Sequence, residues 1–424
     1  MKKEETTVSL KDRKNMRYFL AVLAVVAIGV TMWMCTHNVA EPDGEDSNCV
    51  IAGQLDSLFS TIFTSDTEPG GYALLIKDDT VVYRYVRGLA NLDTKEAIDE
   101  NTRFNFTSGS KIFAAASLLM LAEWGLTSLD DSLSLYFPEF SEDFFKQITI
   151  RDILTHSSGL PDLRPTESSE WSNYIKDNAS VFANSEDYRL YGTSEEYIKC
   201  FKSIRELHYK PGTHYSRNDA AYVLVAPLVE RISGEPYDIW VRENIFRRAG
   251  VENICYINPG APVPAGAHGY RRVNPTTSAK TTFKSADGKW EEYDYGEAPF
   301  FITKADRGAF ITPAEFVKWK RAYYGGKVLN DTSFNAIFNT YIPTSRPNVS
   351  FGLGCALYNP EGSPMCEYHL DRNGGFTSIE GSFPDKNLHY LVLSNRNDWD
   401  FYHVTDELRR LLKLADYFDS KAAL

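Results

Sequence analysis

The feature that most constrains this chain is a short polar segment, Ser108-Gly109-Ser110-Lys111, which leads directly into the apolar, helix-forming run Ile112 to Leu121. At the start of a helix, a hydroxyl and an amine three residues apart lie on the same face, one turn from each other. A neutral lysine amine can take the proton of a serine hydroxyl, and the free N–H groups of a helix N-terminus can stabilise developing negative charge. The segment therefore indicates acyl transfer through a serine ester. A plain helix start with a surface lysine is the alternative, because Ser-x-x-Lys also arises by chance.

The N-terminal segment predicts a location. Residues 2–17 are rich in Lys and Arg, residues 18–34 carry no charge, and the next charged residue is Glu41. An apolar stretch of this length can span a bilayer, and positive charge keeps its N-terminal flank in the cytoplasm. We therefore expect a cytoplasmic segment (1–17), a transmembrane anchor or signal (18–36), a linker (37–50) and a periplasmic or extracellular domain (51–424). Secretion after signal cleavage is the alternative, although no small-x-small cleavage site is evident.

Composition favours a globular enzyme. The chain has 424 residues, 43% of them hydrophobic, and a formal net charge of -12, which suits one large domain or two closely packed lobes. No Lys/Arg run stands out beyond the N-terminus, which argues against nucleic-acid binding. The six cysteines form no Cys-x-x-Cys pair and the histidines have no ligand spacing, so we expect no metal and no other cofactor. Cys355 and Cys366, the closest cysteine pair, could form a hairpin disulfide or remain free thiols.

Several further segments, in order, resemble the penicillin-binding and class C β-lactamase-like serine hydrolases, which include D-alanyl-D-alanine carboxypeptidases, D-aminopeptidases and esterases. The resemblance covers roughly residues 51–415. It implies an α/β chain of the α+β type, with an antiparallel sheet flanked by helices and a mostly helical lobe, at about 130–300, over the active site. The segments that carry it are Gly88 to Phe104, Ile148 to Pro161, Pro211 to Thr213, Tyr222 to Gly234, Ala309 to Trp319, Phe351 to Gly354 and Leu391 to Arg396.

Local patterns agree with such a fold. Ala73 to Ile76 and Thr80 to Tyr85 predict two strands joined by a tight turn, and residues 351–358 and 364–396 alternate as antiparallel strands do. Trp399 to Tyr417 predicts an amphipathic helix. The side chains expected to face inward from this helix are Val404, Leu408, Leu411, Leu412 and Leu414.

The second motif of the resembled family, a Tyr followed two residues later by Asn or Asp, falls on Arg217 and Asp219. Asp is a tolerated variant, but Arg stays protonated and cannot replace Tyr as a proton relay. Arg217 could instead hold a substrate carboxylate, and its charge would lower the pKa of a neighbouring lysine. Tyr215, two residues earlier, would need a local shift of the chain to serve as the relay.

The third motif, Lys-Thr-Gly or His-x-Gly before a Gly-Phe turn, falls on His369, Asp371 and Gly375. We expect His369 in the active site; an ordinary strand histidine is the alternative. Asp371 replaces the glycine that lets substrate approach the strand, so the carboxylate is expected to narrow the cleft or change specificity. Gly375 and Tyr215 are expected to line the same substrate cleft. The resemblance also implies an oxyanion hole made by the backbone N–H of Ser108 with that of Arg372 or Asn373.

His156, in a Thr-His-Ser-Ser-Gly turn, is expected to be structural.

The motif residues are consistent with two functions. The first is an exported serine hydrolase that acts on a peptide, amide or ester, with Ser108 as the nucleophile, Lys111 as the base, and small molecules or peptides, including cell-wall-derived ones, as substrates. The second is a non-catalytic binding or sensing protein on the same fold, which the replacements at Arg217 and Asp371 favour.

Overall fold

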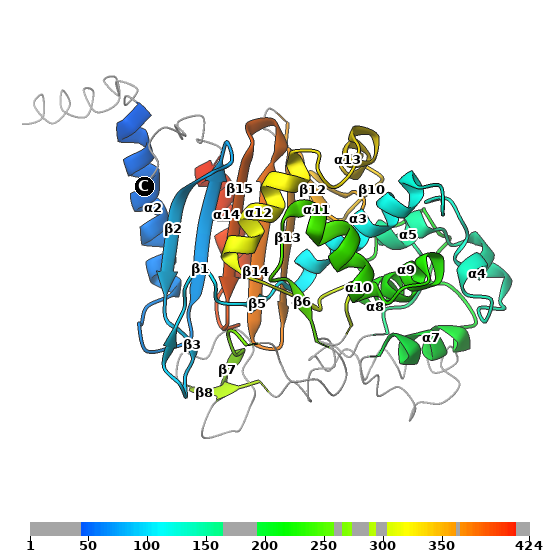
Figure 1. Cartoon of the computed structure of the whole chain (residues 1–424), viewed down its shortest axis with the longest axis horizontal. Coiled ribbons are helices and arrows are strands. Elements are labelled where there is room, and N and C mark those ends of the chain that lie inside the picture. The colour runs from blue at the N-terminus through cyan, green and yellow to red at the C-terminus, as the bar shows by residue number, and fades with distance from the viewer. Residues whose placement is uncertain are drawn as a thin grey trace, which may run out of the picture.

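The structure is a computed structural model that describes residues 44–163, 193–257, 265–273, 288–293, 303–361 and 365–412. Its largest unit is an eight-stranded sheet with the order β10-β11-β12-β13-β14-β15-β1-β2, in which every neighbouring pair is antiparallel. Helices cover both faces of this sheet, and a mostly helical lobe lies beside one end of it (Figure 1). The α+β fold expected from the sequence is confirmed.

The predicted N-terminal hairpin is present and slightly longer than expected. It consists of β1 (Gly71–Lys77) and β2 (Thr80–Arg87). Its two turn residues, Asp78 and Asp79, both have positive φ, at 47° and 63°. A two-residue turn of this kind matches the right-handed twist of the strands it joins.

The C-terminal segment supplies the other six strands. Their pairing confirms the returning antiparallel strands expected within residues 351–358 and 364–396. β15 pairs with β1, so segments more than 300 residues apart in the sequence lie side by side in the sheet. The strands are β10 (Ile342–Pro343), β11 (Val349–Phe351), β12 (Ala356–Tyr358), β13 (Cys366–Asn373), β14 (Phe376–Phe383) and β15 (Leu388–Ser394).

Two helices from opposite ends of the chain share one face of the sheet: α2 (Gly44–Ile62) and α14 (Phe401–Leu412). Residues 44–50, assigned above to a linker, therefore lie in the first turns of α2. In α14 the four predicted inward residues up to Leu412 are buried, because its apolar side chains recur at helical spacing; Leu414 lies outside the described residues.

The other face carries α12 (Pro313–Tyr324) and α3 (Ser110–Glu123), and α3 separates the sheet from the lobe (Figure 1). Side chains from Ser110 to Leu121 are all buried, since both sides of α3 are covered. Within the described part of residues 130–300 the lobe is helical up to Ala249, and short strands follow. Its helices are α4 (Leu133–Tyr136), η2 (Asp143–Gln147), α5 (Ile150–Leu154), α7 (Ser194–Ser203), α8 (Asp219–Val223), α9 (Val225–Ser233), α10 (Tyr237–Val241), η3 (Arg242–Phe246) and α11 (Arg247–Ala249).

Short strands and one further helix complete the described chain. β5 and β6 both pair with β9, which ties the segment before Ser108 to the lobe. The elements are β3 (Leu89–Asn91), β4 (Glu96–Ala97), β5 (Phe104–Asn105), β6 (Cys255–Tyr256), β7 (Tyr270–Val273), β8 (Lys289–Glu292), β9 (Ala309–Ile311), α13 (Asp331–Ile337), and the 3-10 turns η1 (Thr107–Gly109) and η5 (Pro384–Lys386).

Among the described residues no helix is both long and apolar enough to cross a bilayer, and the uncharged segment 18–34 lies outside them. Cys355 and Cys366 are both buried free thiols, so the hairpin disulfide is not formed.

Candidate active site

Ser108 lies in η1, the turn that leads into α3. The preceding residue, Thr107, has a φ of 45°, a region that costs free energy for a residue with a branched side chain. Two contacts hold it there: its N–H donates to Asn105 Oδ1 at 3.1 Å, and its hydroxyl lies 2.5 Å from Ser378 Oγ on β14. The sheet therefore fixes the turn that presents Ser108 to the pocket.

Lys111, one turn into α3, points back to this serine. Its Nζ donates to Ser108 Oγ at 3.1 Å and to the carbonyl oxygen of Asp306 at 3.3 Å, and it forms an ion pair with Asp219 Oδ1 at 2.7 Å. The side chain is almost fully buried. Burial disfavours the ammonium and outweighs the attraction of Asp219, while Arg217 and Arg307 repel it, so the pKa of Lys111 falls to about 8.

Asp219 and Arg217 come from the start of α8, whose N-cap is Asn218. Arg217 reaches across the pocket: its Nη2 donates to Ser108 Oγ at 2.9 Å, and its Nε pairs with Asp219 Oδ2 at 3.2 Å. Burial opposes the charge of Arg217, but the carboxylates of Asp219 and Asp371 outweigh burial and raise its pKa. Arg217 is therefore a fixed cation beside the serine hydroxyl.

Asp371 on β13 completes the cluster. Ser108 Oγ donates a hydrogen bond of 2.9 Å to its Oδ2, and the same oxygen forms ion pairs with Arg217 Nη2 at 2.9 Å and Arg307 Nε at 2.6 Å. Although burial raises the pKa of Asp371, the two guanidinium groups lower it by more. Asp371 is thus an ionised group that accepts a hydrogen bond from Ser108. The sequence predicted that its carboxylate narrows the cleft or changes specificity, and it did not predict this contact.

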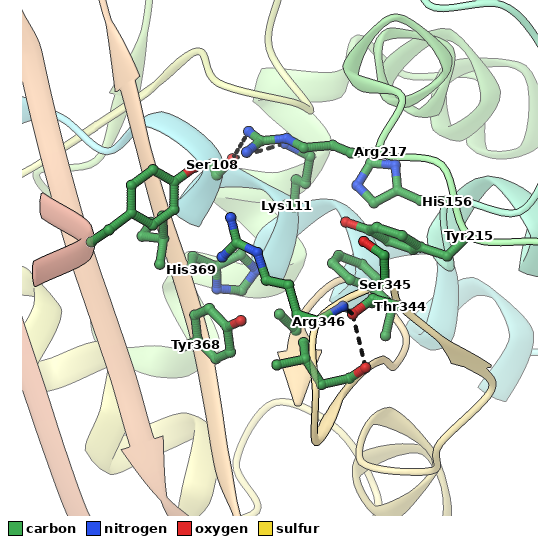
Figure 2. A pocket seen from close by; sticks show the side chains of 15 residues that line it. Ser108, Lys111, His156, Tyr215, Arg217, Thr344, Ser345, Arg346, Tyr368 and His369 are labelled. Atoms are coloured by element: carbon green, nitrogen blue, oxygen red, sulfur yellow. Dashed lines mark hydrogen bonds between the residues drawn. The ribbon is translucent and has the colours of Figure 1, made fainter. Parts of the chain in front are cut away.

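His369 lines the same pocket below Ser108 and Lys111 (Figure 2). Its Nε2 lies 2.6 Å from the carbonyl oxygen of Gly354, and its Nδ1 pairs closely with Glu380. Glu380 in turn pairs with the buried Lys320 at 2.8 Å. Because both ring nitrogens are bound to the protein, the geometry makes His369 a part of the pocket wall, without the contact to Lys111 or Ser108 that a catalytic group would need.

Tyr215 also lines the pocket, with its ring packed on Phe351 at 5.4 Å between centroids. Burial raises the pKa of Tyr215 to about 12, so its hydroxyl stays protonated. No hydrogen bond joins it to Ser108 in the described structure, and Arg217 occupies the place beside the serine that a relay would take.

Gly375 is placed differently from the prediction. It was expected to line the cleft, but it lies in the turn between β13 and β14, where a Cβ would meet the backbone nitrogen of Tyr270 at 2.5 Å. Gly375 therefore serves close packing of two backbones and does not line the pocket.

The strand register defines the direction in which the backbone N–H of Arg372 points. Asn373 pairs with Phe376 across the two-residue turn, and Arg372 pairs with Thr377. The pair next to such a turn is hydrogen-bonded and the following pair is not, so the N–H of Arg372 points away from β14. That edge of β13 packs against η1, the side on which the predicted oxyanion hole would lie.

The pocket has a volume of about 230 Å³. Aromatic side chains from separate elements form its walls, and the guanidinium of Arg346 projects into it toward Ser108 (Figure 2). His156 lines its lobe side, where it is buried and its Nδ1 accepts the N–H of Asn218 at 3.0 Å; burial lowers the pKa of His156 well below its usual value. His156 is therefore a neutral ring that ties the Thr-His-Ser turn to α8.

Comparison with known proteins decides the family. The family model described as Beta-lactamase matches residues 55–415. The chain belongs to the beta-lactamase family. Its relatives include proteins named penicillin-binding protein and D-aminopeptidase, and this chain is a serine hydrolase of the beta-lactamase type.

Three relatives show the extent of the similarity. Penicillin-binding protein 4* of Bacillus subtilis is 22% identical over 364 residues, covering 86% of this chain and 75% of that protein. D-aminopeptidase of Brucella anthropi is 30% identical over 199 residues, covering 47% of this chain and 35% of the relative. The octameric penicillin-binding protein homologue from Pyrococcus abyssi superposes with a TM-score of 0.68 at 22% identity, covering 85% of this chain and 77% of that one.

In this beta-lactamase family member, sequence reasoning missed Arg307 and Arg346. Arg307 lies two residues before the segment Ala309 to Trp319, and it contacts both Asp219 and Asp371. Its signal in the sequence is a charged residue two positions before a buried strand. Arg346 lies in a loop between short strands, and nothing in the local sequence indicates that this loop reaches the pocket.

Proposed function

We propose that this chain hydrolyses a peptide, amide or ester bond through a covalent acyl-enzyme on Ser108. The observation that carries the proposal is the contact of 3.1 Å between Lys111 Nζ and Ser108 Oγ in a pocket. With a pKa of about 8, about a tenth of the Lys111 amines are neutral at pH 7 and able to accept a proton. The names of the relatives, penicillin-binding protein and D-aminopeptidase, favour a peptide or amide substrate, with cell-wall peptides among the candidates.

The proposed reaction has two halves. As Ser108 Oγ attacks the substrate carbonyl, its proton passes to a base in contact with it, which later gives it to the leaving group; the backbone N–H groups of Ser108 and Arg372 hold the oxygen on which negative charge develops. The leaving group departs with a proton, and water then attacks the ester and releases the acyl group. The substrate's acyl part would lie along the aromatic walls of the pocket, whose size suits a single side chain or small peptide.

Intact-protein mass spectrometry after incubation with a fluorophosphonate, and separately with a penicillin, tests this function. We expect one covalent adduct on the wild type and none on Ser108→Ala. Ser117→Ala is the matched control, since Ser117 is a buried serine of the same helix whose hydroxyl donates to the carbonyl of Phe113 at 2.7 Å and does not line the pocket. A wild type that forms no adduct but binds a muropeptide would support the non-catalytic binding function instead.

We further propose that the catalytic part is exported and held at the membrane by residues 18–34. The support is the uncharged segment and its basic flank. Protease treatment of spheroplasts should degrade residues 51–424, and the protein should fractionate with membranes. The mass of the mature protein separates an uncleaved anchor from a cleaved signal peptide. A protected, cytoplasmic protein would contradict export.

A further inference from the structure

The hydroxyl of Ser108 has a single proton and three polar neighbours. Arg217 Nη2, at 2.9 Å, can only donate. Asp371 Oδ2, also at 2.9 Å, is ionised and can only accept. Lys111 Nζ, at 3.1 Å, donates when it is an ammonium and accepts when it is neutral.

The ion pair with Asp219 at 2.7 Å favours the ammonium form of Lys111. An ammonium has three protons, and Lys111 Nζ has three oxygen neighbours: Asp219 Oδ1 at 2.7 Å, Ser108 Oγ at 3.1 Å and the carbonyl of Asp306 at 3.3 Å. Asp219 and the carbonyl can only accept, so Lys111 donates to both in either form, and the two forms differ in the bond to Ser108: the ammonium donates to Oγ and the neutral amine accepts from it. With Lys111 charged, the proton of Ser108 has one acceptor among these neighbours, and that acceptor is Asp371.

We propose that Asp371 is a catalytic residue that takes the Ser108 proton while Lys111 remains an ammonium, and that Arg217 and Asp371 work as a pair. This inference rests on the proposed function of Ser108 as the nucleophile. As the bond from Oγ to the carbonyl carbon forms, the proton moves from Oγ to Asp371 Oδ2. When the carbon–nitrogen or carbon–oxygen bond of the substrate breaks, Asp371 returns the proton to the leaving group.

Deacylation repeats the same steps with water. Asp371 takes one proton of the attacking water, and the acyl–Oγ bond breaks as that proton passes to Ser108. The enzyme returns to its starting form and no other reactant is needed. Arg217 stays in contact with Oγ throughout, so its charge stabilises the oxyanion character of the serine in both transition states.

The two arginines explain how a carboxylate can remain charged in this position. Asp371 is 8% exposed, and an isolated buried carboxylate would take up a proton. Arg217 and Arg307 prevent this, and they also fix the orientation of the carboxylate toward Oγ. A carboxylate held in this way is a weak base, and the hydrogen bond already formed with Ser108 compensates in part because no rearrangement precedes proton transfer.

The pH dependence of acylation distinguishes the two bases. The charged groups that face Asp371 are Arg217, Arg307, Asp219 and Lys111, and the arginines keep their charge at every pH used. If neutral Lys111 were the only base, the rate of fluorophosphonate labelling would fall about tenfold for each pH unit below the pKa of Lys111. If Asp371 takes the proton, the wild-type rate stays nearly level from pH 7 to pH 5.5.

Variants give a second, independent readout. We expect Asp371→Asn to label about 10²–10⁴-fold more slowly at pH 6, and its remaining rate to rise with pH as Lys111 loses its proton. Asp371→Glu should retain part of the rate at pH 6. Asp398→Asn is the matched control, because Asp398 also pairs with two arginines, Arg272 and Arg396, and does not line the pocket. Melting curves identify any variant that fails to fold.

The outcomes separate this inference from the proposed function. A wild type that never labels overturns both. A wild type that labels on Ser108, with a rate that falls tenfold per pH unit from pH 7 to pH 5.5, overturns the role of Asp371 alone. An Asp371→Asn protein that folds and labels at the wild-type rate at pH 6 overturns it as well.

Discussion

Arg217 Nη2 and Asp371 Oδ2 form an ion pair of 2.9 Å across the hydroxyl of Ser108. These are the two positions at which the sequence departs from the motifs of its family, and they lie on different sides of the pocket, Arg217 before α8 and Asp371 on β13. Either replacement alone would leave its charge with one ion-pair partner fewer, Asp219 alone for Arg217 or Arg307 alone for Asp371, in a site of low solvent access. Their contact makes the two replacements compatible, because the positive charge of Arg217 and the negative charge of Asp371 compensate each other.

This relationship predicts non-additive effects. Arg217→Tyr and Asp371→Gly, each made alone, should lower both labelling of Ser108 and the free energy of unfolding. The double variant, which restores the residue types of the family motifs, should recover part of both. We expect a coupling energy of about 0.5–3 kcal/mol from a double-mutant cycle in urea. Effects of the two single variants that simply add in the double variant would contradict the pairing.

The charge network beneath His369 predicts a large effect on stability. Lys320 is fully buried and pairs with Glu367 at 2.7 Å and with Glu380 at 2.8 Å. Lys320→Met would leave both carboxylates buried without this cation, which should cost about 3–5 kcal/mol of unfolding free energy. The measurement is urea denaturation.

Lys318→Met serves as its control on the same helix, because Lys318 is half-exposed and pairs with Glu315 at 2.8 Å. Glu315 is buried but also accepts the N–H of Glu252 at 2.8 Å, so removing the half-exposed Lys318 ammonium should cost about 0–1 kcal/mol. Equal losses in the two variants would argue against a structural role for the buried network.

Stability should fall in mild acid because of His389. This ring is buried, bonds to Ser382 Oγ at 2.8 Å, and has a pKa lowered to about 3 by burial and then by the charge of Lys320. Between pH 6.5 and pH 3 the unfolded chain therefore binds a proton that the folded chain excludes, so the stability drops as the pH falls, by up to about 1.4 kcal/mol per pH unit.

Urea denaturation between pH 6.5 and pH 5 measures this slope before most carboxylates titrate. His389→Gln should give a shallower slope than the wild type. Some slope should remain, since His156 is also held neutral by burial and contributes with the same sign. An unchanged slope would exclude His389 as a source of the acid sensitivity.

The turn between β13 and β14 predicts a strong requirement for glycine. Gly375 has a φ of 84°, and a Cβ there would lie 2.5 Å from Tyr270 N and 2.6 Å from the carbonyl carbon of Gly269. Gly375→Ala should therefore cost clearly more than Gly326→Ala, where φ is 69° but no atom lies within 4 Å. The control should lose about 1–2 kcal/mol for its left-handed backbone alone. Equal melting temperatures would contradict the packing argument.

The sequence by itself determined the local elements. Two strand-forming runs around a turn predicted the β1–β2 hairpin, and alternation predicted the later strands. Helical periodicity predicted α14 with its buried Val404 and Leu408, and the spacing of three residues placed Ser108 and Lys111 on one turn. These features depend on neighbours in the chain, so their patterns are visible without the fold. The start of α2 was missed because its first residues are polar and contain glycine, which reads as a linker.

Only the tertiary structure decided which charges meet at Ser108. Asp371 lies 263 positions beyond Ser108 in the chain, and Arg307 reaches the cluster from a loop that no family motif marks. The sequence suggested that Arg217 holds a substrate carboxylate, whereas in the fold Arg217 pairs with the carboxylate of Asp371. The fold also pairs His369 with Glu380. An ionic partner depends on which loops and strand edges converge and on how much water they exclude, and these are properties of the packed molecule that no local pattern encodes.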